Sequence, residues 1–193
     1  MGVEFELKFS AEPEQLEAVA AAYPVEYHRI SMETTYYDTT DHALSDRHVT
    51  LRRRMENGES VCTVKTPISQ LGRGEWECQC EDIESGIKEL CKHGAPKDLL
   101  ILTADGVAPV CGAKFTRRAG VVTLQDAVVE IALDRGILSG GGKEIPLCEV
   151  EVELKSGDQN AAISFALALA ERFGLKSQEK SKFRRALALA KGE

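Results

Sequence analysis

The sequence predicts an α+β protein in which eight antiparallel strands curl into a barrel or tunnel with helices on its outside. β-type segments follow one another along most of the chain, with helical segments grouped at insertions and at the end. At least six of these segments alternate apolar and charged residues, which gives each strand one apolar and one charged face. No repeat, low-complexity run or linker interrupts residues 1–193, so we expect a single domain.

The first half of the chain predicts one strand, one helix and then four more strands. VEFELKF (3–9) alternates strictly, and AEPEQLEAVAAAY (11–23) is amphipathic with Pro13 near its start. The four β-type segments that follow lie at about 27–38, 48–56, 60–66 and 74–80. Asn57-Gly58 is a strong hairpin signal between the second and third of these four segments.

The second half predicts a helical insertion, three more strands and two closing helices. The insertion has Leu90 and 99–102 as its apolar residues. Strands are expected near 113–125, 127–134 and 147–155, with RGILSGGGKEIP joining the last two. The triple glycine 140–142 lacks the spacing of a nucleotide phosphate-binding loop, so we interpret it as a mobile hairpin loop. The closing helices are expected at about 158–174 and 178–190.

Composition disfavours several classes of protein. The 24 basic and 31 acidic residues give a net charge of -7, which argues against a general nucleic-acid or membrane-surface binder. The chain has no run of 18 apolar residues and no signal-peptide pattern, so we expect a cytoplasmic protein without a membrane partner. The cysteines have no zinc-like spacing and predict buried, reduced thiols at Cys62, Cys78, Cys80, Cys91, Cys111 and Cys148.

The charged faces differ in sign along the chain. The first and last strands are mainly acidic, at Glu4, Glu6, Glu149, Glu151 and Glu153. Strands between them carry basic residues, at Arg52, Arg54, Lys65 and Arg117. An open sheet would show these charges to water, whereas a curled sheet would turn them toward a shared cavity. In a cavity they need water, one another and charged ligands.

This separation of charge favours the cavity. Carboxylates at i and i+2 on two strands can converge on a hard cation such as Mg²⁺ or Mn²⁺. Arginine and lysine suit the oxygens of phosphate. The pattern therefore predicts a site for a metal-bound polyphosphate. A DNA-contact run at 52–54 is disfavoured, because its arginines divide between two strand faces of an acidic chain.

Glu4-x-Glu6-x-Lys8 resembles the ExExK signature of the CYTH superfamily, the triphosphate tunnel metalloenzymes. The other motifs follow in that family's order: LRRR (51–54), TVKTP (63–67), RGEWE (73–77), Arg117, VEIALDRG (129–136) and CEVEVELKSGD (148–158). SKFRR (181–185) resembles the Ser-Lys-x-x-Arg helix of bacterial inorganic triphosphatases, although Ala186 and Leu187 replace the Gly and aromatic that often follow. The resemblance covers nearly the whole chain. It implies an eight-stranded tunnel, divalent-metal dependence and action on triphosphates.

The charged faces and the resemblance together predict residue roles. The predicted ligands of Mg²⁺ or Mn²⁺ are Glu4, Glu6, Glu149, Glu151 and Glu153. The predicted clamp on the phosphate oxygens is Lys8, Arg52, Arg54, Lys65, Arg73, Arg117, Lys182 and Arg185. Glu4, Glu6 and Lys8 form the predicted catalytic group. The predicted tunnel-wall partners of the basic residues are Glu75, Glu77, Glu130 and Asp134.

The predicted activity is metal-dependent hydrolysis of inorganic triphosphate to pyrophosphate and phosphate. The alternatives are a class IV-type adenylate cyclase, a thiamine or nucleoside triphosphatase, and a polyphosphate-binding module without turnover. A cyclase needs a base pocket, for which the sequence has no identifying pattern. Five carboxylates near the ligand argue against a pure anion binder. The expected partner is a small triphosphate and not a nucleic acid. The sequence leaves open whether the protein forms a homodimer.

Overall fold

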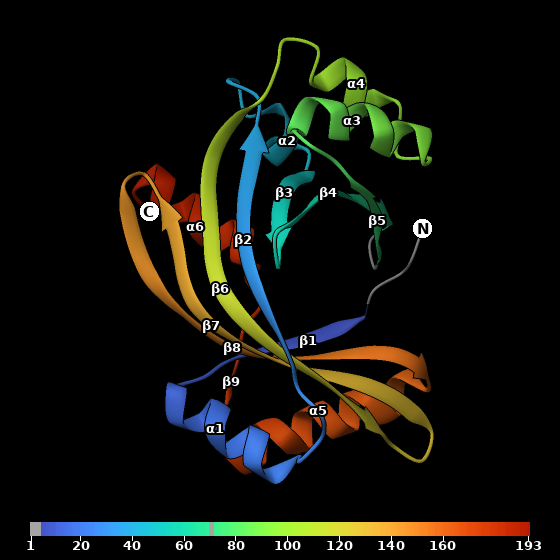
Figure 1. Ribbon diagram of the computed structural model, residues 1–193, viewed down its shortest axis with the longest axis vertical. Coiled ribbons are helices and arrows are strands. Elements are labelled where there is room, and N and C mark those ends of the chain that lie inside the picture. Colours follow the sequence, from blue (N-terminus) through green and yellow to red (C-terminus); the bar gives the residue numbers. More distant parts are fainter. Residues whose placement is uncertain (1–4, 70–71) are drawn as a thin grey trace.

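The computed structural model describes residues 5–69 and 72–193, and the side chains of all of these except 68–69 and 72–73. One antiparallel sheet of nine strands forms the body, in the order β5-β4-β3-β2-β6-β7-β8-β1-β9. Its strands are β1 (Glu6–Ser10), β2 (His28–Asp38), β3 (Thr50–Glu56), β4 (Glu59–Ser69), β5 (Gly72–Gln79), β6 (Ala108–Thr123), β7 (Ala127–Gly140), β8 (Lys143–Gly157) and β9 (Lys176–Ser177). Figure 1 shows the sheet curling through most of a circle, with β5 and β1 facing each other. The predicted α+β class is confirmed.

The sheet has two edges in the described part of the chain. β5 lies at one edge and β9 at the other, where Ser177 pairs with Phe9 of β1. β9 is two residues long and was not predicted, while the eight longer strands correspond to the eight predicted ones. The protein is therefore a strongly curled sheet with a concave face and a convex face.

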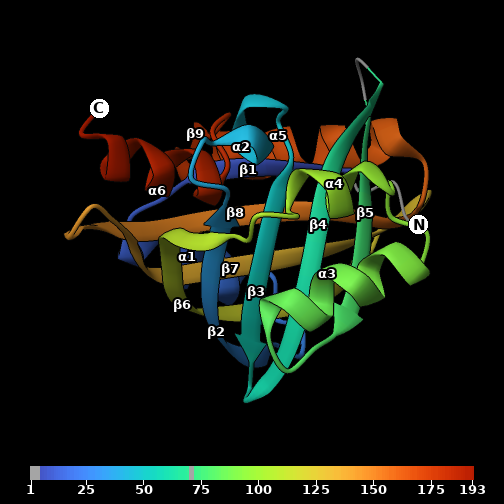
Figure 2. The ribbon, with the colours of Figure 1, turned by 90° about the horizontal axis from the view of Figure 1, so that it is seen from above.

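Helices lie on both faces of the sheet. They are α1 (Pro13–Ala22), α2 (Ala43–Asp46), α3 (Ile83–Lys92), α4 (Asp98–Leu102), α5 (Gln159–Phe173) and α6 (Lys182–Lys191). α1 and α5 pack on the convex face of β7, β8 and β1, and α3, with α4 beside it, covers the convex face of β4 and β5. α6 lies on the concave face against β6 and β7 (Figures 1 and 2). None of the described helices has the length and apolar character needed to cross a membrane.

Strand alternation determines which side chains each helix covers. Val150 and Val152 of β8 are buried in the cluster beneath α1 and α5, and each such burial stabilises by roughly 1.5–3 kcal/mol. Glu149 and Glu151 alternate with them and therefore project to the concave face. The apolar face thus holds the helices in place, while the charged face is directed to the centre of the curl.

The predicted loop at 135–146 is wrong, because β7 and β8 continue through it. They pair from Ala127–Gly157 to Gly140–Lys143, and the turn is only Gly141-Gly142, with φ values of 57° and 74°. Two residues with positive φ suit the right-handed twist of a tight hairpin. Gly136 lies within the strand because a Cβ there would meet the backbone oxygen of Lys114 at 2.1 Å. These glycines therefore allow close packing and a tight turn, and do not interrupt the strands.

The prediction of six reduced cysteines is also wrong for two of them. Cys62 on β4 and Cys80, just after β5, form a disulfide with a Cα–Cα distance of 5.9 Å. Cys62 pairs in register with Cys78, so Cys80 is its diagonal neighbour two residues on. This neighbour relation depends on the register of two strands, which cysteine spacing alone does not reveal. The remaining four cysteines have free thiols.

Candidate active site

The register of β1, β8, β7 and β6 aligns charged side chains in rows across the concave face. In one row Glu149 is the neighbour of Asp134, which is in turn the neighbour of Arg117. The row beside it contains Lys8 and Glu151, and the next contains Glu6, Glu153 and Glu130. Four strands therefore bring residues from both ends of the sequence to one surface.

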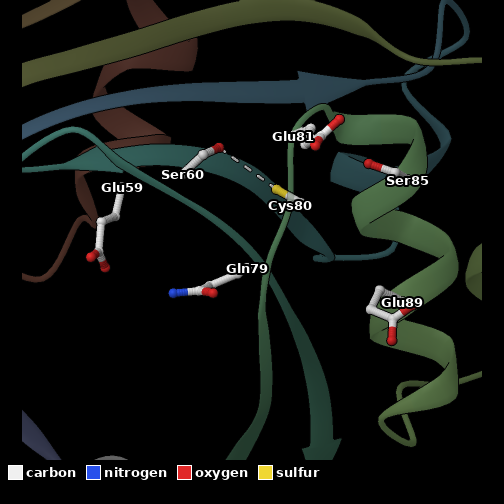
Figure 3. Close-up of a pocket in the computed structure, with 7 residues that line it drawn as sticks. All are labelled: Glu59, Ser60, Gln79, Cys80, Glu81, Ser85 and Glu89. Carbon is white, nitrogen blue, oxygen red and sulfur yellow. Dashed lines mark hydrogen bonds between the residues drawn. The ribbon is translucent and has the colours of Figure 1, made fainter.

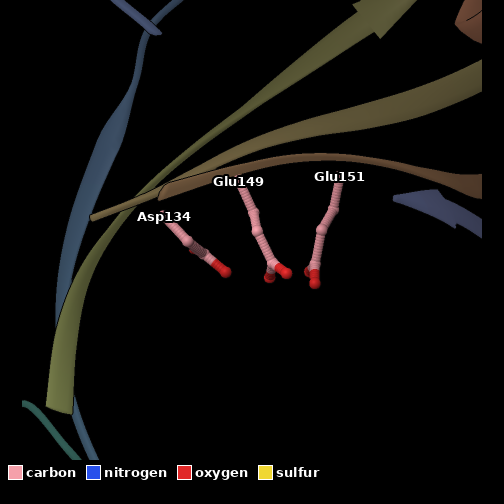
Figure 4. A group of neighbouring side chains, drawn as sticks. All are labelled: Asp134, Glu149 and Glu151. Atoms are coloured by element: carbon pink, nitrogen blue, oxygen red, sulfur yellow. The ribbon is translucent and has the colours of Figure 1, made fainter. Parts of the chain in front are cut away.

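Three of these carboxylates form a buried cluster. Asp134, Glu149 and Glu151 point to the same side from adjacent strands (Figure 4), and one oxygen from each lies within 4.8 Å of the others. Asp134 and Glu149 are fully buried, and Glu151 is 6% exposed. Carboxylates so close together in a buried space require cations.

Three basic side chains supply that charge. Lys182, at the start of α6, places Nζ 2.8 Å from Asp134 Oδ2, 2.6 Å from Glu149 Oε2 and 2.6 Å from Glu151 Oε1. Arg117 donates two hydrogen bonds of 2.8 Å to Asp134 and also pairs with Glu151. Arg185 pairs with Glu149. We call these residues the inner network: Asp134, Glu149, Glu151, Arg117, Lys182 and Arg185.

For Lys182 and Glu151 of the inner network, opposite charges outweigh the effect of burial on the pKa. Burial alone would lower the pKa of Lys182, but Glu151, Asp134 and Glu149 outweigh it and raise that pKa. Burial would raise the pKa of Glu151, but Lys182 and Arg117 outweigh it and lower that pKa. Three carboxylates therefore face three cations, and the set is formally neutral.

Local structure holds α6 over these carboxylates. Ser181 caps the helix by accepting a hydrogen bond from the backbone N–H of Arg184 at 3.2 Å. Phe183 and Ala186 are buried in the apolar cluster of β2, β6, β7 and β8. The ring of Phe115 lies 5.3 Å from Lys182 Nζ. Sequence reasoning did not find Phe115, although it shares the strand parity of Arg117.

A second group of basic residues lies on β3 and β4, and we call Arg52, Arg54 and Lys65 the basic wall. Glu75 lies 3.6 Å from Arg52 Nη2 and 3.0 Å from Lys65 Nζ, which is the arrangement predicted for a wall carboxylate. Arg54 is buried, and its Nε donates a 3.0 Å hydrogen bond to Thr34 Oγ1. Burial, and then the charges of Arg52 and Arg117, lower the pKa of Arg54. Arg54 pairs in register with Thr34 of β2, and Thr34 pairs with Ala113 of β6, which has the strand parity of Arg117. The basic wall and the inner network therefore face the same concave side of the sheet.

The remaining predicted residues that the structure describes form their contacts outside the inner network, although Lys8 is the strand neighbour of Glu151. Lys8 pairs with Glu6 at 2.8 Å, and Lys155 pairs with Glu153 at 3.0 Å and lies 3.9 Å from Glu130. Glu77 is exposed and accepts a 3.4 Å hydrogen bond from Thr63. Glu4 and the side chain of Arg73 lie outside the described residues.

The clustered carboxylates fit a hard divalent cation by their donor chemistry, since all three offer oxygen. This set differs from the predicted one. Asp134, predicted as a wall residue, joins Glu149 and Glu151, whereas Glu6 and Glu153 lie together two rows away.

A separate pocket of about 550 Å³ lies away from all of these residues. Figure 3 shows its lining, which comes from β4, the end of β5 and α3: Glu59, Ser60, Gln79, Cys80, Glu81, Ser85 and Glu89. None of these residues carries a predicted role. The pocket is therefore not part of the candidate site.

Comparison with known proteins decides the family. The model of the CYTH domain matches residues 2–187. The chain belongs to the CYTH domain family. A curated CYTH relative, the inorganic triphosphatase of Haemophilus influenzae, is 29% identical over 174 residues. That match covers 86% of this chain and 49% of the relative, so this chain spans about half the length of the curated protein.

Solved structures share the CYTH fold described above. A protein from Pyrococcus horikoshii has 25% identity and a TM-score of 0.62, covering 97% of this chain and 99% of its own. HpAC1 from Hippeastrum, described as an adenylyl cyclase candidate with a dominant triphosphatase activity, has 15% identity and a TM-score of 0.62, with 98% and 96% covered. At this identity the second likeness supports the fold alone.

Proposed function

We propose that this CYTH chain hydrolyses inorganic triphosphate to pyrophosphate and phosphate with Mg²⁺ or Mn²⁺. The observation that carries the proposal is a buried carboxylate cluster beside guanidinium groups that have spare donors. Among the described residues, the Nε atoms of Arg52 and Arg185 are buried and have no hydrogen-bond partner. Buried donors of this kind are normally satisfied, and phosphate oxygens would satisfy them.

Asp134, Glu149 and Glu151 would hold a divalent ion, with Glu6 and Glu153, which share the row beyond Glu151, as further oxygen donors. When bound, such an ion neutralises phosphate charge and activates water. Hard oxygen donors are the ligands that Mg²⁺ and Mn²⁺ prefer. Glu4 stays a predicted ligand that lies outside the described residues.

The chain's own residues would position the phosphates. The arginines of the basic wall offer planar forks of donors, and Lys8 and Lys65 offer point charges. Lys182 and Arg185 lie three residues apart on one side of α6 and would bind the phosphate nearest that helix. Phosphoryl transfer depends mainly on positioning and electrostatic stabilisation, and burial strengthens both.

The experiment is phosphate release from inorganic triphosphate, ATP and thiamine triphosphate, each with Mg²⁺, Mn²⁺ or EDTA. We expect rapid release from inorganic triphosphate that EDTA abolishes. The ATP reaction is also assayed for cyclic AMP. Cyclic AMP with pyrophosphate would assign the same residues to a cyclase, and turnover of thiamine triphosphate alone would assign them to an organic triphosphatase. A complete lack of turnover would leave only a polyphosphate-binding module.

A further inference from the structure

The geometry of the inner network points to an exchange of partners. We propose that Lys182 and the divalent metal compete for one binding position between Asp134, Glu149 and Glu151. Lys182 fills that position in this structure and would keep metal affinity low before triphosphate binds. Triphosphate attracts the Lys182 ammonium away from the carboxylates. The binding of metal and the binding of triphosphate therefore strengthen each other. This inference rests on the proposed function for the identity of the two ligands.

The first support is that both cations would use the same oxygens. Lys182 Nζ lies 2.6–2.8 Å from one oxygen of each carboxylate. These carboxylates are the group with metal-ligand spacing among the described residues. A divalent ion bonds carboxylate oxygens at about 2.0–2.6 Å and would lie almost where the ammonium lies. Two like charges cannot share so small a buried space, so occupation is exclusive.

The second support is the charge balance of the network. Three carboxylates already face Lys182, Arg117 and Arg185, so the set is neutral without a metal. Adding a divalent ion alone would leave two uncompensated positive charges in a buried site. A triphosphate supplies the missing negative charge and gives the displaced ammonium a new partner. Metal and triphosphate should therefore each raise the affinity for the other.

The third support is that Lys182 can leave without unfolding α6. Of its three ionic contacts, only the one to Glu151 has hydrogen-bond geometry, and Glu149 Oε2 receives no hydrogen bond. The helix stays anchored by the Ser181 cap and by buried Phe183 and Ala186. Rotation of the flexible Lys182 side chain is therefore enough to free the position between the carboxylates.

The test is calorimetric titration of the substrate-free protein with Mn²⁺. We expect Lys182→Met to bind Mn²⁺ at least about tenfold more tightly than the wild type, which is within the usual range of coupling between sites. Arg184→Met is the matched control, because it removes an exposed positive charge from the same helix and should leave affinity unchanged. Lys182→Arg keeps a cation between the three carboxylates and should therefore restore weak Mn²⁺ binding.

Two further comparisons make the result decisive. If Lys182→Met does not fold, Lys182→Gln retains a polar side chain that can still donate to Glu151, and it should show the same tighter binding. Unchanged Mn²⁺ affinity in a folded neutral variant overturns the competition. Phosphate release by the wild type is measured in parallel. Turnover with unchanged affinity removes this inference alone, whereas tighter binding without turnover removes the proposed activity alone.

Discussion

The central carboxylates of β7 and β8 are buried, whereas an ion pair between β4 and β5 keeps part of its surface in contact with solvent. Asp134 and Glu149 have no exposed side-chain surface, but Lys65 and Glu75 are 21% and 22% exposed. The cause is α6, which covers the concave face of β6 and β7, while α3 and α4 lie on the convex side of β4 and β5.

The two regions of the concave face therefore differ in how they respond to the loss of a charged residue. In the inner network every charge depends on a partner, so removing one residue leaves a buried ion uncompensated. At Lys65 and Glu75, water can replace a lost partner, so their contact contributes little to stability. Lys65 can therefore adjust to a ligand, while the carboxylates of the inner network keep a defined geometry.

Breaking the inner network should have the largest effect. Asp134→Ala removes the partner of both Arg117 and Lys182, and should lower the free energy of unfolding by about 3–5 kcal/mol. The control is Glu130→Ala on the same strand, whose partly exposed pair with Lys155 should contribute less than about 1 kcal/mol. Urea denaturation measures both. Equal losses would mean that burial does not distinguish the two carboxylates.

Glu151→Gln should act mainly on turnover. The amide still accepts a hydrogen bond from Lys182, but it lacks the charge of the proposed metal ligand, so we expect triphosphatase activity to fall about a hundredfold. The measurement is initial rate against Mn²⁺ concentration. Glu77→Gln is the control, because that exposed wall residue contacts Thr63 and not the inner network. Full activity in folded Glu151→Gln would exclude Glu151 as a ligand.

A smaller effect is expected on the basic wall. Lys65→Ala should raise KM for inorganic triphosphate about tenfold, equivalent to about 1.4 kcal/mol, and change stability by less than about 1 kcal/mol. Lys114→Ala serves as the control, since Lys114 is exposed and pairs with Glu33 at 3.5 Å, away from the site. A wild-type KM in Lys65→Ala would remove Lys65 from the phosphate clamp.

The smallest effect is expected from mild acid. The pKa of Glu151 lies below its ordinary value of 4.5, because Lys182 and Arg117 outweigh the effect of burial. The folded form therefore binds its proton less readily than the unfolded form, and the pair stabilises the fold fully above about pH 4.5. The stability difference between wild type and Glu151→Gln should stay constant from pH 7 to pH 5 and shrink below that. A difference that already shrinks between pH 7 and pH 5 would contradict this.

The sequence predicted well what depends on alternation within one strand. The alternation of charged and apolar residues in 3–9, 51–54, 60–66 and 148–155 predicted that Lys8, Arg52, Lys65 and Glu151 lie on one face of the sheet. A single-domain chain, the possible homodimer and the residue roles stay predictions.

Features that depend on register between strands were not predictable. Asp134 looked like a wall residue, because its pairing with Glu149 on one side and Arg117 on the other is fixed only by the sheet. The Cys62–Cys80 disulfide depends on register in the same way. The segment 135–146 indicated a loop between two strands, since the close contacts that require Gly136 and Gly140 come from elements distant in the sequence.

One of these contacts sets the distance between the β7–β8 hairpin and helix α6. A Cβ on Gly140 would lie 2.3 Å from the backbone oxygen of Ala186, so even alanine there would push α6 away from the sheet. Ala186 is one residue beyond Arg185 and four beyond Lys182. The small size of Gly140 thus sets how deeply Lys182 and Arg185 reach among the carboxylates, so a substitution in this hairpin would alter the candidate site from outside it.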